Sequence, residues 1–153
     1  MIARRVLLGA PILALTACSL KQQPKGNLIV PDHLTADPHG FYHDDEAIDG
    51  ELFKVWAASQ NNPDWAAVSH VSAVQRVVEG EAAYAYLHTA LNAGGKDDGA
   101  QAAAIADAYT NWPGRFTDVV RIGVFDVKGK RLGRPVMVQP ARNCPPPPRT
   151  PPR

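Results

Sequence analysis

The amino-acid sequence predicts a small α+β domain in which three or four helices pack on a C-terminal β-hairpin. Apolar residues recur at helical spacing through residues 44–112, and beyond Val119 they alternate with other residues as in a strand. An apolar fraction of 45% among 153 residues excludes a wholly disordered chain and a collagen-like repeat. We therefore expect residues 41–140 to form one domain around a single core.

Two helices are predicted at the beginning and the end of the helical region. The first covers residues 44–60, where Asp44 or Asp45 can cap the N-terminus. The last is alanine-rich and covers residues 98–109. The apolar stripe of the first helix, which we expect to face the core, consists of Ile48, Leu52, Val55 and Trp56.

Helical spacing recurs in two segments between these helices. The first segment begins at Pro63, and its β-branched residues leave a strand open as an alternative. Its stripe consists of Val68, Val71, Val74 and Val78. Beyond Gly80, a further helix up to Gly94 is predicted from apolar residues at offsets 0, 3 and 7, namely Tyr84, Leu87 and Leu91.

The C-terminal part of the domain is predicted to be a β-hairpin. Residues 119–127 are rich in β-branched residues, and residues 128–130 can turn the chain into a second arm over residues 131–139. Because Pro135 has no N–H to donate, the second arm is expected at an edge of the sheet. A hairpin alone is unstable in water, so it should pack on the helices.

The N-terminus has the pattern of a bacterial secretory signal. Arg4 and Arg5 precede an uncharged apolar stretch, Val6 to Ala17, which is too short for a stable membrane span. At the end of this stretch, Leu15-Thr16-Ala17-Cys18 resembles the lipobox of bacterial lipoproteins. The alternative is an ordinary signal peptide with a cysteine close to the cleavage site.

The resemblance to lipoproteins implies that residues 1–17 are removed and that Cys18 is thioether-linked to diacylglycerol. Acylation of the new N-terminus, for example with palmitate, often follows. One acyl chain gives only marginal membrane binding, whereas two or three hold a protein firmly. Ser19 stands where an Asp would retain the lipoproteins of enteric bacteria in the inner membrane. The same resemblance therefore implies an outer-membrane anchor with the domain facing the periplasm.

Two segments outside the domain are predicted to be extended. Residues 18–40 are punctuated by proline and glycine and are interpreted as a lipidated tether. Residues 141–153 contain six prolines and no acidic residue, which predicts a disordered or polyproline II tail. If Cys18 carries lipid, Cys144 has no partner within the chain. It is then either an unused thiol or the site of an intermolecular disulfide.

Charge is segregated along the sequence. Thirteen acidic residues stand against three basic residues between Asp32 and Asp107, whereas nine basic residues stand against two acidic ones after Asn111. Such asymmetry indicates a charged partner surface, unless the two halves simply face each other or water.

No catalytic, metal or cofactor site is predicted. His33, His39 and His43 are the nearest approach to a zinc-ligand set, but a polar linker leading into a helix cap explains them without metal. Neither the H-E-x-x-H nor the G-x-S-x-G pattern is present. The basic end has no interleaved aromatic residues, so nucleic acid is not an expected partner.

These patterns favour a non-enzymatic, membrane-anchored envelope lipoprotein that binds another envelope protein or the cell wall. In general plan the chain is similar to small lipoproteins of secretion, conjugation and pilus machines and to the outer subunits of phage spanins. One alternative is a periplasmic ligand binder or enzyme, in which Tyr84, His88, Trp112 or the histidine cluster would converge on a pocket. Another is an immunity or inhibitor lipoprotein whose acidic helices block a basic toxin site.

Overall fold

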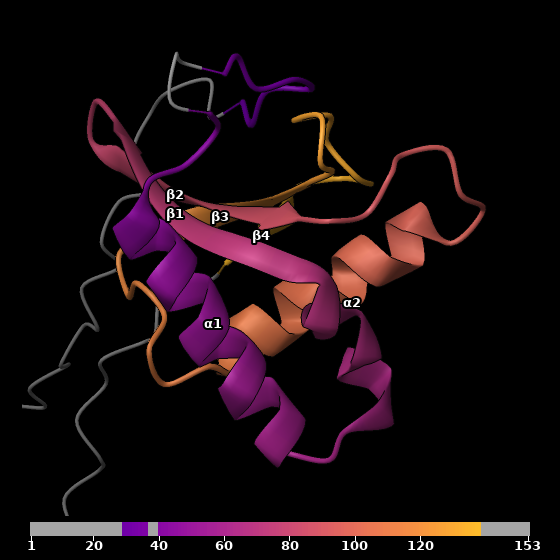
Figure 1. Cartoon of the computed structure of the whole chain (residues 1–153). Helices are drawn as coiled ribbons and strands as arrows, with labels where there is room; N and C mark the ends of the chain where they lie inside the picture. The colour runs from indigo at the N-terminus through magenta and orange to yellow at the C-terminus, as the bar shows by residue number, and fades with distance from the viewer. Residues whose placement is uncertain (1–28, 37–39, 139–153) are drawn as a thin grey trace, which may run out of the picture. The chain divides into compact units, whose positions relative to one another are not determined.

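The computed structural model describes residues 29–36 and 40–138, which belong to one compact unit spanning residues 24–141 (Figure 1). Cys18, His39 and Cys144 lie outside the described residues. The helices in this part are α1 (Asp44–Ser59), the 3₁₀ helix η1 (Pro63–His70) and α2 (Asp98–Asn111). The strands are β1 (Val71–Glu79), β2 (Ala82–Thr89), β3 (Val119–Phe125) and β4 (Val136–Met137).

The four strands form one mixed sheet in the order β1-β2-β3-β4. Strand β2 is antiparallel to β1 and parallel to β3, and β3 is antiparallel to β4. A parallel pair needs a crossover, and α2 supplies it between β2 and β3. In Figure 1, α1 and α2 lie together on one side of the sheet. The expected α+β class is therefore correct.

Two segments that the spacing predicted as helices contain strands. The segment that begins at Pro63 is helical only as far as His70, in η1, and then forms β1, while the segment of Tyr84 and Leu87 forms β2. All eight residues of β2 are buried, because both faces of this central strand are covered. An apolar run of this kind satisfies offsets of 0, 3 and 7 without being helical. Gly80, with a φ of +61°, occupies the first position of the two-residue turn that joins the strands.

The other elements agree with the sequence. Helices α1 and α2 form where they were expected, and β3 provides the first arm of the predicted hairpin. The second arm is reduced to the two residues of β4, which lies at the edge of the sheet directly after Pro135. Proline fits there because an edge strand leaves part of its N–H row unpaired.

The predicted core stripe of α1 is wrong for three of its four residues, whereas the fourth, Trp56, is partly buried and packs against the core. Ile48, Leu52 and Val55 are 60%, 56% and 68% exposed, whereas the buried residues of the helix are Gly50, Phe53 and Ala57. Phe53 decides the orientation, because its ring packs on two aromatic residues of the core. Its ring centroid lies 5.9 Å from that of Tyr109 and 5.2 Å from that of Trp112.

Gly50 allows α1 to lie directly on the backbone of β1. A Cβ atom at this position would come within 2.8 Å of the Ser72 carbonyl oxygen and of the Ala73 Cα atom. The close approach coincides with a bulge between Val71 and Ala73 in the pairing with β2. Only glycine therefore lets Phe53 reach the core at this distance.

The opposite face of the sheet carries a second, smaller core. It consists of Val30, Ala82, Tyr84, Tyr86 and Phe125. Val30 belongs to the segment 29–36, which covers this face of the sheet. Leu34 of the same segment is partly buried against the small core. The sequence did not predict this packing, because so short an apolar segment has no periodicity that indicates a partner.

We expect Gly50→Ala to destabilise the domain by about 1–3 kcal/mol, because the added methyl group meets backbone atoms that cannot give way cheaply. A thermal melt followed by circular dichroism measures the effect as a lower Tm. The matched control is Gly99→Ala in α2, where an added Cβ meets nothing within 4 Å and should be neutral or stabilising. Equal melting of both variants would contradict the close approach.

Candidate functional site

Of the histidines considered as zinc ligands, His33 and His43 lie in the described part of the chain. His33 lies in an isolated bridge with Lys130, and His43 stands at the N-cap of α1, where its backbone N–H donates to Glu46 Oε2 at 2.7 Å. Within residues 29–36 and 40–138, no group of three or more His, Cys, Asp or Glu side chains is placed to hold a metal ion.

The side chains considered for a catalytic pocket do not converge. Tyr84 and Trp112 are both buried, but Tyr84 belongs to the small core on one face of the sheet and Trp112 to the large core on the other. His88 is buried as well, with the ring centroid of Tyr42 at 5.0 Å and that of Phe125 at 6.2 Å. These three residues are packing residues of two separate cores.

His88 is neutral at physiological pH. Its Nε2 atom lies 3.2 Å from Gln75 Oε1, and burial among aromatic rings lowers its pKa to about 4. A neutral imidazole with an amide partner satisfies a buried polar position, and a general base would need access to substrate.

A polar seam, which we define as Asp32, Arg131 and the backbone groups they bind, attaches residues 29–36 to the β3–β4 connection. The Arg131 guanidinium lies 2.5 Å from an Asp32 carboxylate oxygen and donates to the Val30 carbonyl at 2.5 Å. The backbone N–H of Arg131 also donates to the Asp32 carbonyl at 2.8 Å. The backbone N–H of Leu34 donates to the Gly129 carbonyl at the same distance of 2.8 Å. The seam fixes residues 29–36, which the sequence assigned to the tether, to the domain.

The turn beside the seam is organised by Asp126. Its buried carboxylate accepts backbone N–H groups from Ala93 at 3.1 Å, Lys128 at 2.8 Å and Lys130 at 2.7 Å. Burial alone would raise the pKa of Asp126, but these three donors outweigh it and hold the pKa below its ordinary value. Since its oxygens are engaged, Asp126 supports the turn and does not offer a ligand site.

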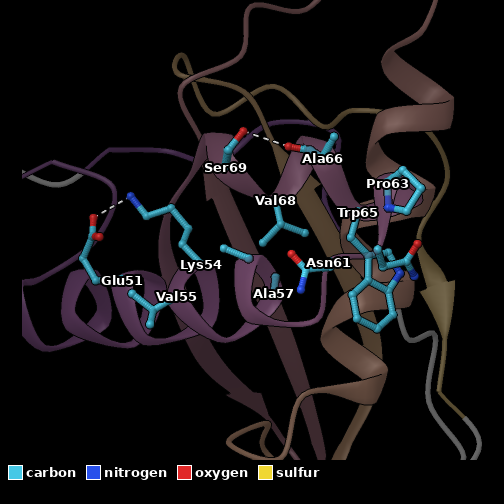
Figure 2. Close-up of a pocket in the computed structure, with 12 residues that line it drawn as sticks. Glu51, Lys54, Val55, Ala57, Asn61, Pro63, Trp65, Ala66, Val68 and Ser69 are labelled. Atoms are coloured by element: carbon cyan, nitrogen blue, oxygen red, sulfur yellow. Dashed lines mark hydrogen bonds and ion pairs between the residues drawn. The ribbon is translucent and has the colours of Figure 1, made fainter.

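A groove of about 660 Å³ lies between α1 and η1 (Figure 2). Apolar and small side chains dominate its lining, with one ion pair, Lys54 Nζ to Glu51 at 2.5 Å, at its rim. Ser69 donates to the Ala66 carbonyl at 2.8 Å, so its hydroxyl is not paired with a base. The lining residues are Glu51, Lys54, Val55, Ala57, Ala58, Asn61, Asn62, Pro63, Trp65, Ala66, Val68 and Ser69.

This groove is suited to bind apolar groups. The Trp65 indole donates to Asp107 Oδ2 at 2.8 Å, which fixes the ring at one end of the groove. No histidine is among the residues that line it, so the lining provides no imidazole base for the Ser69 hydroxyl. The sequence did not indicate this site, because it depends on the outward orientation of Val55 and on the path of η1.

Comparison with known proteins gives no relative: no family model, no curated protein and no solved structure shows significant similarity to this chain. In the part that the structure describes, no helix is both long enough and apolar enough to cross a membrane.

We expect the stability of the domain to fall as the pH decreases from about 6.5 to 4. The folded state holds His88 with a pKa of about 4, while the unfolded chain takes up this proton near 6.5. The unfolded state therefore binds more protons than the folded state in this pH range. The resulting loss in the free energy of unfolding is limited to about 3 kcal/mol. Urea unfolding at pH 7.5 and pH 5 measures the difference. A pH dependence unchanged in His88→Gln would contradict this assignment.

We expect Arg131→Gln to release residues 29–36 from the sheet, because it removes the ion pair with Asp32 and the bond to the Val30 carbonyl. Hydrogen exchange should become faster at Leu34, whose amide bonds to Gly129, while β2 amides stay protected. Arg134→Gln is the matched control, since Arg134 is exposed. Unchanged exchange at Leu34 would show that the seam does not hold the segment.

Proposed function

We propose that this chain is a lipid-anchored protein of the bacterial envelope that acts as a non-enzymatic interaction or assembly component, tethered to the outer membrane and facing the periplasm. The observation that carries the proposal is the sequence Leu15-Thr16-Ala17-Cys18 directly after a charged N-terminus and an apolar stretch. Lipid on Cys18 would attach every later residue to a bilayer.

Tethering is the mechanism of this proposal. Ten residues lie between Cys18 and Ile29, where the described part begins, and an extended chain reaches about 40 Å over this interval. A domain confined within that distance of a membrane meets partners there at a raised effective concentration. The proline-rich residues 145–153, which include Arg149 and Arg153, would extend the reach toward a second component, either an envelope protein or the anionic cell wall.

The polar seam supports this mechanism. A pull along the predicted tether would reach the domain at residues 29–36, where Arg131 and Asp32 join the segment to the β3–β4 connection. The load would then pass into the sheet through β3. The predicted packing of the C-terminal hairpin on the helices is part of the same proposal, and the shared core of Ile122 with Ile105 of α2 supports it.

An immunity or inhibitor lipoprotein is the second candidate. Helix α1 contains five carboxylates and one lysine, and such a face would suit a basic toxin surface. This candidate shares the anchor and differs in the partner. A ligand-binding or enzymatic role has less support, because Tyr84, His88 and Trp112 are buried apart from each other.

We expect metabolic labelling with an alkyne palmitate to mark the wild-type chain and to fail in Cys18→Ser, because the thioether and the new N-terminus both depend on Cys18. Cys144→Ser is the matched control and should label normally. Inhibition of the lipoprotein signal peptidase should leave a larger precursor, and density-gradient fractionation should place the labelled chain with the outer membrane. Unlabelled, freely soluble wild-type protein would overturn the proposal.

A further inference from the structure

The outward face of α1 carries an apolar stripe, which we define as Ile48, Leu52 and Val55. More than half of each side chain is exposed. Because the residues follow each other at intervals of four and three, they lie in line along one side of the helix, over about 10 Å. Nothing in the described part of the chain covers this stripe, and exposed apolar rows of this kind mark interaction sites.

The stripe continues into the groove between α1 and η1. Val55 belongs to both, and it lies on the α1 side of the groove with Trp65 at the other end in Figure 2. Ala58 and Ala66 line the space with small side chains. A row of large side chains beside a groove lined by small ones allows the side chains of a second helix to interdigitate with both.

Carboxylates border the stripe on both sides. On a helical projection, Asp44 and Glu51 fall on one side of it and Asp45 and Asp49 on the other. Glu51 is paired with Lys54, but in the described residues no ion pair involves the three aspartates. Burial and the nearby charge of Asp45 raise the pKa of Asp49, as expected for acidic groups that lack a cation.

This charge argues against two occupants of the stripe. A second copy would bring another helix with five carboxylates and one lysine against the first, and an anionic lipid surface would repel the same groups. A cationic partner with an apolar face meets both requirements, because it buries the stripe and neutralises the bordering aspartates.

We propose that the α1 stripe and the adjoining groove bind a basic amphipathic helix of another protein. The apolar side of that helix covers Ile48, Leu52 and Val55, and its lysine or arginine residues face Asp45 and Asp49. This is the helix-in-groove mode of recognition. The inference names the partner class of the proposed function, but the binding itself does not require lipid on Cys18.

The test uses the full chain in phosphatidylcholine vesicles and a synthetic 18-residue peptide of leucine and lysine with leucine on one helical face. The peptide contains no tryptophan, so the intrinsic fluorescence of the chain's three tryptophans, one of which is Trp65 at the groove, reports binding. Leu52→Asp should weaken binding at least about tenfold, since a buried leucine contributes that much. Met137→Asp, at an equally exposed apolar residue on β4, should bind as the wild type does.

A second pair of variants tests the charge. Asp45→Asn combined with Asp49→Asn should weaken binding several-fold and reduce its salt dependence, whereas Asp97→Asn at the N-cap of α2 should change neither. Leu52→Asp adds negative charge, so tighter binding in that variant would mean attraction by charge alone. That result would overturn the proposal.

Four further outcomes would overturn it. Two of them concern the peptide: equal binding of a peptide with the same composition but scrambled leucines, or equal binding of a leucine–glutamate peptide. The other two concern the occupants argued against above: self-association of the chain that Leu52→Asp abolishes, or binding of the chain without peptide to phosphatidylglycerol vesicles that depends on Leu52. Because Leu52 is exposed, its variant should melt within a few degrees of the wild type, which separates lost binding from lost folding. Failure of the binding test with normal labelling at Cys18 would leave the proposed anchor intact.

Discussion

The burial of β2 on both faces is the constraint on which the rest of the structure depends. All eight of its residues are buried, so the sheet needs a cover on each side. Helices α1 and α2 supply one cover around Phe53 and Tyr109, and residues 29–36 supply the other through Val30. The parallel pairing of β2 with β3 places α2 as the crossover between them. Residues 29–36, which the sequence assigned to the tether, are consequently part of the fold.

The same constraint determines which surfaces are left for a partner. Gly50 lies against the backbone of β1 and Phe53 is buried in the core, so this side of α1 packs on the sheet. The opposite side of the helix, with its apolar stripe and its carboxylates, is therefore exposed. Helix α1 then contributes to the core with one side and leaves the other side for the proposed partner. The polar seam belongs to a different region, around the β3–β4 connection, so the proposed attachment and the proposed recognition use separate groups.

Much of the helical structure could be predicted because its signals are local. Acidic residues at the start of α1 and the alanine-rich composition of α2 specify helices whatever the surroundings are. Strand β2 could not be separated from a helix, because a run buried on both faces shows no alternation. Strand β1 is only partly buried, and its valines at intervals of three and four also fit a helix. The composition of the valine stripe did leave a strand open, and its β-branched residues are the signal that was right.

The candidate sites were less predictable than the fold. Arg131 and Asp32 are distant in sequence, and neither lies in a pattern that links them. Val55 was expected in the core from its spacing with Ile48, yet it lines the groove. Spacing reveals that one side of a helix is apolar, but α1 has apolar residues on two sides. The choice between them depends on Phe53, Gly50 and the backbone they meet.

By itself, the sequence determined what depends on neighbouring residues: the composition of a folded α+β domain, the ends of two helices, and the segregation of charge. Tertiary structure alone decided which face of α1 is buried, that β2 is the central strand, and that Arg131 holds residues 29–36. The physical reason is that these outcomes depend on close packing and desolvation between segments far apart in the chain, and such energies have no counterpart in local spacing.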